Sequence, residues 1–218
     1  MQKMTLVFDL DDTLVKEIEY LKSAFRAIAA QVDAGNSGLF DEMFGWYQAK
    51  EDVFGNLGQR YENAVKEDMK AIYRNHVPQF DALSESRDLL LSLKREGHNL
   101  GLVTDGFSVT QRNKIKALDI GHLFDRIVVS EEFGSEKPSE QNFSVFHEFG
   151  TKDYFYISDN ISKDFIAPNK LGWKTVCLLD DGQNIHRQDF NREAAYLPQY
   201  KINHLHELND LLAGMSDS

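Results

Sequence analysis

The chain has 218 residues, of which 42% are hydrophobic and 27% charged, and its formal net charge is -11. This balance is ordinary for a folded globular protein and excludes an intrinsically disordered chain. The acidic charge disfavours nucleic-acid backbones and anionic membranes as partners, and no apolar run approaches the roughly 20 residues that span a bilayer. We therefore expect neither nucleic acid nor membrane among its partners.

The N-terminus and the cysteine content indicate where the protein works. A strand pattern begins within a few residues of Met1, which predicts the absence of a signal peptide. Cys177 is the only cysteine, so an intrachain disulfide is excluded and a reducing compartment fits. Because Cys177 lies in the apolar run TVCLL, we expect a core position and not a nucleophile. These features predict a cytoplasmic protein.

Short apolar runs rich in β-branched and aromatic residues predict five strands, over residues 4–8, 99–103, 126–130, 154–158 and 174–179. Helical patterns lie before or between the later strands, over residues 84–96, 108–117, 139–149 and 162–171. Ser108 and Gln111 have the spacing of a capping box, Pro138 suits a first helical turn, and Pro168 is expected to kink its helix or delay its start. The alternation predicts an α/β protein with a Rossmann-like open parallel sheet.

Residues 16–82 break this alternation and contain no strand pattern. Two apolar helical faces mark the segment, one of Ile18, Leu21, Phe25, Ile28 and Val32 and one of Val65, Met69, Ile72 and Tyr73. We expect a helical cap over residues 16–82 and a core of residues 1–15 and 83–218. An insert after the first strand would cover the carboxyl edge of the sheet, where open α/β sheets bind ligands.

Polar clusters follow the predicted strands and converge on that edge. They are Asp9-Leu-Asp11-Asp-Thr13, Thr104-Asp105-Gly106, Lys137-Pro138 and Ser158-Asp159-Asn160 with Asp164. Asp9 and Asp159 come from neighbouring strands and can share a hard cation such as Mg²⁺, which prefers oxygen ligands. A carboxylate can attack phosphorus, a second carboxylate two residues on can transfer the proton, and Thr104 and Lys137 can hold the phosphoryl oxygens. The pattern predicts phosphoryl transfer through an aspartyl-phosphate.

The segments FDLDDTL, LVTDG, EKP and ISDNISKD resemble the four motifs of the haloacid dehalogenase superfamily, over about residues 4–15 and 99–180. The resemblance implies that Asp9 is the nucleophile and an Mg²⁺ ligand. It implies that Asp11 is the general acid/base, with its backbone carbonyl on the metal, and that Asp159 is the metal-binding acid. Ser158 stands where the family usually has glycine.

The resemblance also implies roles around these carboxylates. Thr104 matches the phosphate-binding hydroxyl, with Asp105 and Gly106 forming the turn behind it, and Lys137 matches the lysine that steadies the nucleophile and the phosphoryl group. Asp164 is expected to support the metal waters or Lys137. The remaining assignments are phosphate binding at Leu10 and outer support of the metal at Asn160.

Related chemistries define the alternatives. Dehalogenases lack an acid two residues after the nucleophile, so Asp11 disfavours dehalogenation. Phosphonatases need a Schiff-base lysine in the cap, and nothing singles out one among Lys22, Lys50, Lys66 and Lys70. A phosphomutase and a non-catalytic binding protein stay open. We expect a phosphatase for a small phosphorylated metabolite, because TDGFSVTQRNKIKAL and LFDRIVVSEEFGSEKP resemble nucleotidases and N-acylneuraminate phosphatases. Such an enzyme would act on a nucleotide or a sugar phosphate, as a monomer or homodimer.

Several other residues have less specific expectations. Asp12 fits a turn residue better than a ligand, and His204 and His206 fit structural positions better than a metal site. In the cap, aromatic residues fit lid core better than a substrate pocket; they are Trp46, Tyr47 and Phe54. Arg26 and Arg60 suit either surface salt bridges or an anion on the substrate.

Overall fold

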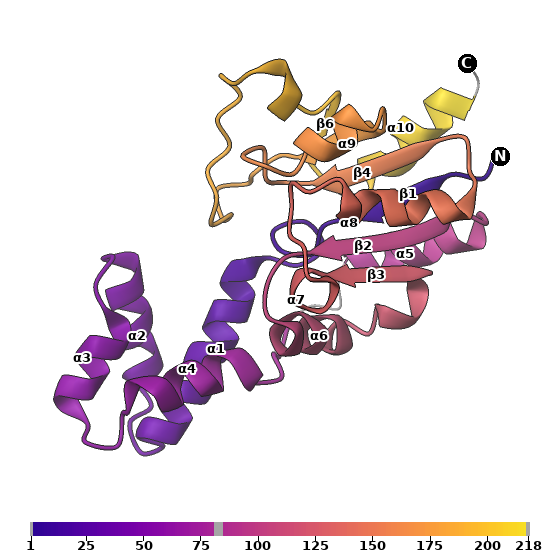
Figure 1. The fold of residues 1–218 in the computed structure, drawn as a ribbon. Helices are drawn as coiled ribbons and strands as arrows, with labels where there is room; N and C mark the ends of the chain where they lie inside the picture. The colour runs from indigo at the N-terminus through magenta and orange to yellow at the C-terminus, as the bar shows by residue number, and fades with distance from the viewer. Residues whose placement is uncertain (1, 81–84, 217–218) are drawn as a thin grey trace.

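The computed structural model describes residues 2–80 and 85–216. In this part of the chain, six parallel strands form one sheet in the order β3-β2-β1-β4-β5-β6 (Figure 1). The strands are β1 (Thr5–Phe8), β2 (Asn99–Thr104), β3 (Arg126–Val129), β4 (Tyr154–Ser158), β5 (Lys174–Leu178) and β6 (Tyr200–Ile202). The predicted α/β fold with an open parallel sheet is therefore confirmed.

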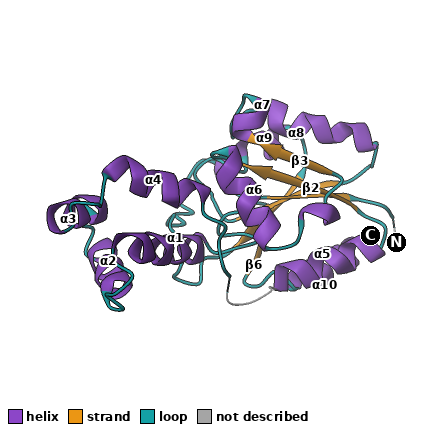
Figure 2. Ribbon diagram, turned by 90° about the horizontal axis from the view of Figure 1, so that it is seen from below, coloured by secondary structure: helices purple, strands orange, loops and turns teal. Residues whose placement is uncertain are grey.

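Helices cover both faces of the sheet, and four more stand beside its carboxyl edge (Figures 1 and 2). The core α-helices are α5 (Glu85–Arg95), α6 (Ser108–Ala117), α7 (Ser130–Phe133), α8 (Gln141–Ser144), α9 (Ile166–Lys170) and α10 (Glu207–Ser216). Three 3₁₀ helices complete the core: η1 (Gly121–Leu123), η2 (Val145–Phe149) and η3 (Ala194–Tyr196). Within the described residues, no helix combines the length and apolar character that a membrane crossing requires.

The two faces of the sheet bury two separate apolar clusters. Leu6 and Phe8 point to the cluster that α5, α6 and α10 cover, whereas Val7 points to the cluster under α8, η2 and α9. This period-two alternation explains why all four residues of β1 are buried and why three of them in a row are apolar. Cys177 lies in the second cluster, where burial raises the pKa of its thiol to about 12. Its predicted core position is confirmed.

Several local predictions need correction. The strand β6 escaped the pattern search because it has only three residues and Lys201 among them is exposed. The predicted helix over 139–149 is instead the short α8 followed by η2, and Pro138 lies outside both. Phe143, Phe146 and Phe149 all pack on the same cluster at a spacing of three, which is the 3₁₀ period.

The capping box at Ser108 is also wrong. Phe107 is the N-cap of α6, with no side-chain cap, and the Ser108 hydroxyl donates to Glu132 over 2.5 Å. The start of α9 at Ile166 agrees with the delay expected from Pro168. The predicted helix start at 84 and the domain boundary at 82/83 lie outside the described residues.

The insert contains α1 (Glu17–Val32), α2 (Leu39–Gln48), α3 (Val53–Arg60) and α4 (Lys66–Asn75). These helices enclose an apolar cluster of their own, built around Phe25, Ile28 and Met43. Val65 was predicted on the apolar face of α4, but it is the N-cap residue and 51% exposed. The helices stand beside the sheet's carboxyl edge (Figures 1 and 2).

We expect Gly101→Ala to lower the free energy of unfolding by about 1–3 kcal/mol. An added Cβ on this β2 residue would overlap Cε1 of the buried Phe146 ring and come within 2.8 Å of Cδ1. Gly45→Ala in α2 is the matched control, because a Cβ there meets nothing within 4 Å. The control should be neutral or raise stability by up to about 1 kcal/mol. Urea denaturation measures both, and equal midpoints for the two variants would contradict the packing argument.

Candidate active site

The predicted polar clusters meet at the carboxyl edge of the sheet. Strand β1 pairs with β4, Phe8 lies opposite Ile157, and the Asp9 amide donates to the Ile157 carbonyl over 2.9 Å. Asp9 and Asp159 therefore leave adjacent strand ends. Both line one cavity of about 280 Å³, together with Asp11, Asp12, Glu17, Thr104, Asp105, Lys137, Asn160, Lys163, Ile185 and His186. All four clusters contribute to this lining, whereas Leu10, Gly106 and Asp164 do not line the cavity.

Lys137 is a buried cation between two carboxylates. Its Nζ donates to Asp9 Oδ1 over 2.6 Å, to Asp164 Oδ2 over 2.7 Å and to the Tyr156 hydroxyl over 3.2 Å. Burial alone would lower the pKa of Lys137, but Asp164 and Asp9 raise it well above its ordinary value. A permanently charged lysine thus holds the Asp9 carboxylate in place.

The carboxylates at the two strand ends are poorly neutralised. Burial raises the pKa of Asp9 to about 7, although Lys137 opposes the rise. Burial and then the charge of Asp9 raise the pKa of Asp159 to about 8. Within residues 2–80 and 85–216 no ion pair reaches Asp159, and the Asn184 amide donates to its Oδ2 over 3.0 Å. This side of the cavity therefore favours a further positive charge.

The donor set fits Mg²⁺. Asp9, Asp159 and the backbone carbonyl of Asp11 would hold the ion through oxygen atoms, and Mg²⁺ also keeps several waters. In the described part of the chain, the buried Oδ1 of Asp164 lacks a hydrogen-bond partner and could accept from such a water. Residues 2–80 and 85–216 contain no group of three or more His, Cys, Asp or Glu side chains able to hold a metal. The site therefore suits a largely hydrated cation and not a closed cage of side chains.

Ser158, in the position usually held by glycine, adds a hydrogen bond to Asp164. Its hydroxyl donates to Asp164 Oδ2 over 2.5 Å, and the Tyr156 hydroxyl donates to the same oxygen over 3.1 Å. The serine thus adds a bond that fixes Asp164 against Lys137. Asn160 lies at the start of the next turn, where its Oδ1 accepts from the Ser162 amide over 3.0 Å.

Hydrogen bonds connect Thr104 to Asp11 through Gln111. The Thr104 hydroxyl donates to Gln111 Oε1 over 3.2 Å, and Gln111 Nε2 donates to Asp11 Oδ2 over 3.2 Å. The other oxygen of Asp11 accepts from Lys114 Nζ over 2.6 Å. Burial would raise the pKa of Asp11, but Lys114 and the neighbouring hydrogen bonds hold it below its ordinary value. Both oxygens of Asp11 are therefore held by hydrogen bonds from α6.

The turn after β2 requires its glycine. Gly106 has φ +134°, and a Cβ there would come within 2.8 Å of Gln111 Nε2. Asp105 spans the cavity wall, with Oδ1 accepting from the Lys137 amide over 3.1 Å and Oδ2 from Lys163 Nζ over 2.5 Å. The turn therefore holds Asp105 against both Lys137 and Lys163.

Asp12 binds backbone at the start of the insert. It has φ +55°, and its carboxylate accepts from the Glu17 amide and from the Ile185 amide, both over 2.9 Å. These bonds join β1, the first turn of α1 and the loop after β5. The position agrees with the turn role predicted for Asp12.

Gln111, Lys114 and Asn184 are among the polar residues of the site that the sequence search missed. Gln111 and Lys114 lie three residues apart on α6, next to Ile115 on its buried face. A lysine among buried helix positions is a signal that could have identified Lys114. Asn184 had no such signal, because it lies in a loop that only the folded chain brings to Asp159.

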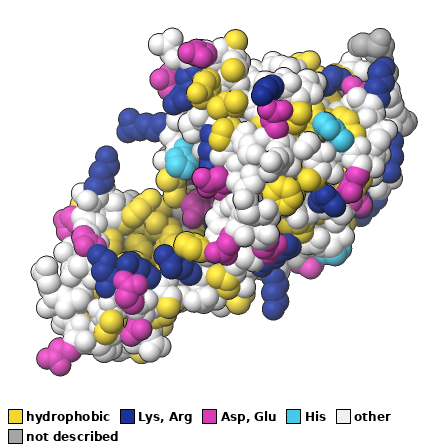
Figure 3. Space-filling view, in the orientation of Figure 1, with side chains coloured by type: hydrophobic (Ala, Val, Ile, Leu, Met, Phe, Trp, Pro, Cys, Tyr) yellow, Lys and Arg dark blue, Asp and Glu magenta, His cyan; other side chains and the backbone are white. Residues whose placement is uncertain are grey.

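A larger cavity of about 420 Å³ adjoins the first between the insert and the core, and Asp11, Glu17 and Asp105 line both. Its other walls include Tyr20, Phe54, Lys70, Tyr73, Arg74 and Phe107. Apolar side chains bordered by Lys and Arg gather on this side of the insert (Figure 3). Phe54 thus lines a pocket, whereas Arg60 pairs with Glu42 on the surface over 2.6 Å.

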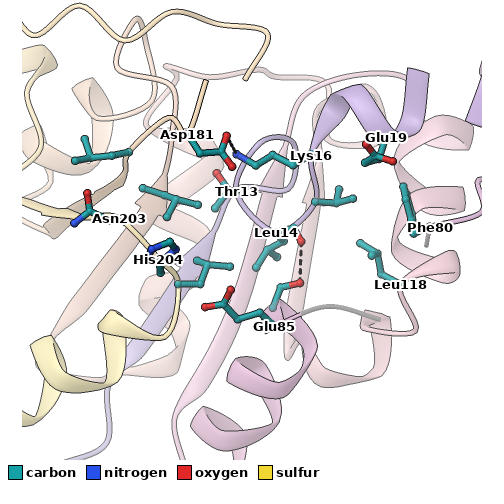
Figure 4. Close-up of a pocket in the computed structure, with 15 residues that line it drawn as sticks. Thr13, Leu14, Lys16, Glu19, Phe80, Glu85, Leu118, Asp181, Asn203 and His204 are labelled. Atoms are coloured by element: carbon teal, nitrogen blue, oxygen red, sulfur yellow. Dashed lines mark hydrogen bonds and ion pairs between the residues drawn. The ribbon is translucent and has the colours of Figure 1, made fainter. Parts of the chain in front are cut away.

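A separate cavity of about 340 Å³ lies beside the chain that leads into α1 (Figure 4). Thr13, Lys16 and His204 line it, and Lys16 Nζ contacts Asp181 Oδ1 over 2.9 Å. The rings of His204 and His206 stack, and His206 bonds to Glu85, which agrees with structural positions for both. The site carboxylates Asp9, Asp11 and Asp159 do not line this cavity.

Comparison with known proteins identifies the family of the chain. A family model described as haloacid dehalogenase-like hydrolase matches residues 6–178. Glyceraldehyde 3-phosphate phosphatase from Methanocaldococcus jannaschii is 30% identical over 96% of this chain and 97% of its own length. Pyrimidine 5'-nucleotidase YjjG from Escherichia coli is 28% identical over 56% of this chain and 53% of its own length.

A solved structure gives the same fold. The HAD-hydrolase YfnB from Bacillus subtilis, in a structure bound to magnesium, has a TM-score of 0.66 and 20% identity. The match covers 97% of this chain and 99% of that one. The family model and the archaeal relative together settle the classification: this chain is a hydrolase and belongs to the haloacid dehalogenase-like family.

Proposed function

We propose that the chain is a Mg²⁺-dependent phosphatase that hydrolyses a small phosphomonoester through an aspartyl-phosphate. The observation that carries the proposal is the buried Asp9 carboxylate, fixed by Lys137 beside Asp159, with Asp11 between the two adjoining cavities. Residues 1–15 and 83–218 act as the catalytic core, and residues 16–82 act as its cap. The phosphatase names of the relatives support the same reaction class.

In the proposed reaction Asp9 attacks phosphorus in line, and the bond from phosphorus to the leaving oxygen breaks. Asp11 gives a proton to that oxygen and then accepts one from the water that cleaves the aspartyl-phosphate. Lys137 keeps Asp9 aimed at phosphorus, and Thr104 binds an equatorial oxygen. A bound Mg²⁺ supplies positive charge that stabilises the phosphoryl group in the transition state.

Each of the two cavities binds one part of the substrate. The smaller one surrounds the phosphoryl group with Asp9, Thr104 and Lys137, and the larger one receives the leaving group. The walls of the larger cavity combine aromatic rings with cationic Lys70 and Arg74. This lining suits a polar organic leaving group, such as the sugar or nucleoside of a phosphorylated metabolite.

We further propose that the enzyme works in the cytoplasm, as a monomer or homodimer.

Phosphate release from p-nitrophenyl phosphate tests the proposal. We expect turnover with Mg²⁺ and a loss of at least about 100-fold after chelation, restored by added Mg²⁺. A panel of sugar phosphates and nucleotides then identifies the substrate by released phosphate. Conversion of one sugar phosphate into its isomer without phosphate release would instead identify a mutase. No turnover of either kind across the panel with Mg²⁺ present would refute an enzymatic role in phosphoryl transfer.

A further inference from the structure

Lys114 is a buried cation at the junction of the insert and the core. Its side chain is only 1% exposed, and Nζ contacts Asp11 Oδ1 at 2.6 Å and the carboxylate of Glu17. The same atom lies 4.3 Å from the centroid of the Tyr20 ring. Glu17 and Tyr20 belong to α1, whereas Lys114 belongs to α6 of the core. One charge therefore joins the proposed acid to the first helix of the insert.

We propose that Lys114 is a positioning residue that aims the Asp11 carboxylate at the leaving-group oxygen, an inference that rests on the proposed phosphatase function. Lys114 holds one oxygen of Asp11, and Gln111 holds the other over 3.2 Å. Asp11 lines both cavities, so its carboxylate lies where the phosphoryl group and the leaving group meet. Fixing both oxygens removes the rotation that would carry the proton away from that point.

A purely structural role is the competing explanation, because the Lys114–Glu17 contact also fastens α1 to α6. Other bonds already fasten the insert to α6, through α4. The Thr110 hydroxyl donates to the Arg74 carbonyl over 3.0 Å, and Asn113 Nδ2 donates to the Asn75 and His76 carbonyls over 2.9 and 3.1 Å. Burying a lysine is costly unless partners compensate, so the contact with Asp11 calls for a role beyond attachment.

The chemistry of the leaving group separates the two roles. A p-nitrophenolate leaves as a stable anion and needs little help from an acid, whereas a benzyl alkoxide must receive a proton as its bond to phosphorus breaks. Proton transfer from a positioned acid contributes about 10²–10⁴-fold to such a step. A misplaced Asp11 therefore slows benzyl phosphate far more than p-nitrophenyl phosphate, whereas loosening of the insert slows both alike.

The experiment measures kcat/KM for both substrates in Lys114→Met. We expect the ratio of benzyl to p-nitrophenyl phosphate to fall about 100-fold. Lys116→Met on the exposed side of α6 is the matched control and leaves the ratio unchanged. Lys114→Arg keeps the charge and should restore the ratio to within about tenfold of wild type. Because both substrates are measured on one preparation, the ratio does not depend on the folded fraction.

A double variant completes the test. In an Asp11→Asn background, Lys114→Met should change the kcat/KM of benzyl phosphate by less than about twofold, because the group that it positions is gone. An unchanged substrate ratio in Lys114→Met, or the same fold-loss in both backgrounds, overturns the positioning role while leaving the phosphatase proposal intact. A wild-type protein that releases phosphate neither from these two substrates nor from any member of the panel overturns both proposals.

Discussion

Replacing Asp9 with Asn should lower phosphate release from p-nitrophenyl phosphate by about 10⁴-fold or more. The amide cannot form the aspartyl-phosphate, while its size preserves the packing around Lys137. The fold should persist, because burial disfavours the charge of Asp9 and raises its pKa to about 7, and Lys137 keeps its ion pair with Asp164. The loss would therefore reflect chemistry and not unfolding.

Phosphate release and thermal melting of the same sample provide the measurement. Asp210→Asn, on the exposed side of α10, is a matched carboxylate-to-amide control and should keep wild-type activity. Incubation with substrate followed by mass measurement should detect a phosphorylated protein in wild type and none in Asp9→Asn. Turnover near the wild-type rate in a pure Asp9→Asn sample would remove Asp9 from the nucleophile position.

The variant Lys137→Met should have a free energy of unfolding about 3–5 kcal/mol lower than that of wild type at pH 8. It should also lose its phosphatase activity. Lys137 is the cation that the structure places 2.6 Å from Asp9 and 2.7 Å from Asp164, and all three side chains are buried. Removing Lys137 leaves the buried carboxylates of Asp9 and Asp164 facing each other with no cation between them. Lys163→Met is the control, because Lys163 is 36% exposed in its contact with Asp105 and should lose at most about 1 kcal/mol.

The loss in Lys137→Met should depend on pH with a definite sign. Burial raises the pKa of Asp9 to about 7 even beside Lys137, and without the lysine the pKa rises further. A carboxyl group whose folded pKa exceeds its unfolded pKa binds a proton more readily when folded, so it destabilises the fold as pH increases. The difference from wild type should thus be smaller at pH 5 than at pH 8 in urea denaturation. A difference that grows on acidification would contradict this account.

The sheet and the convergence of the motif residues could be predicted because both depend on local pattern. Strand β4 has the predicted bounds, and its pairing with β1 brings Asp9 next to the end of the strand that precedes Asp159. Parallel strands have their carboxyl ends on the same edge, so polar residues directly after them must be neighbours. No side-chain geometry is needed for that conclusion.

The other features depend on contacts between distant segments. Lys114 reaches Asp11 across 103 positions, and Asn184 reaches Asp159 across 25 from a loop without a regular pattern. Neither pairing leaves a local trace in composition or periodicity. The 3₁₀ geometry that begins at Val145 likewise follows from where the phenylalanines pack and not from helix propensity.

The segment that connects Asp9 to the insert is short and is held by hydrogen bonds. Only residues 10–16 separate Asp9 from the start of α1, and Asp12 in that stretch is bonded to both Glu17 and Ile185. These hydrogen bonds couple the start of α1 to the segment that carries Asp11. For protein engineering, the consequence is that a foreign insert cannot simply be exchanged at this joint: the graft must carry its own linker and a matching loop after β5 to keep Asp11 in place.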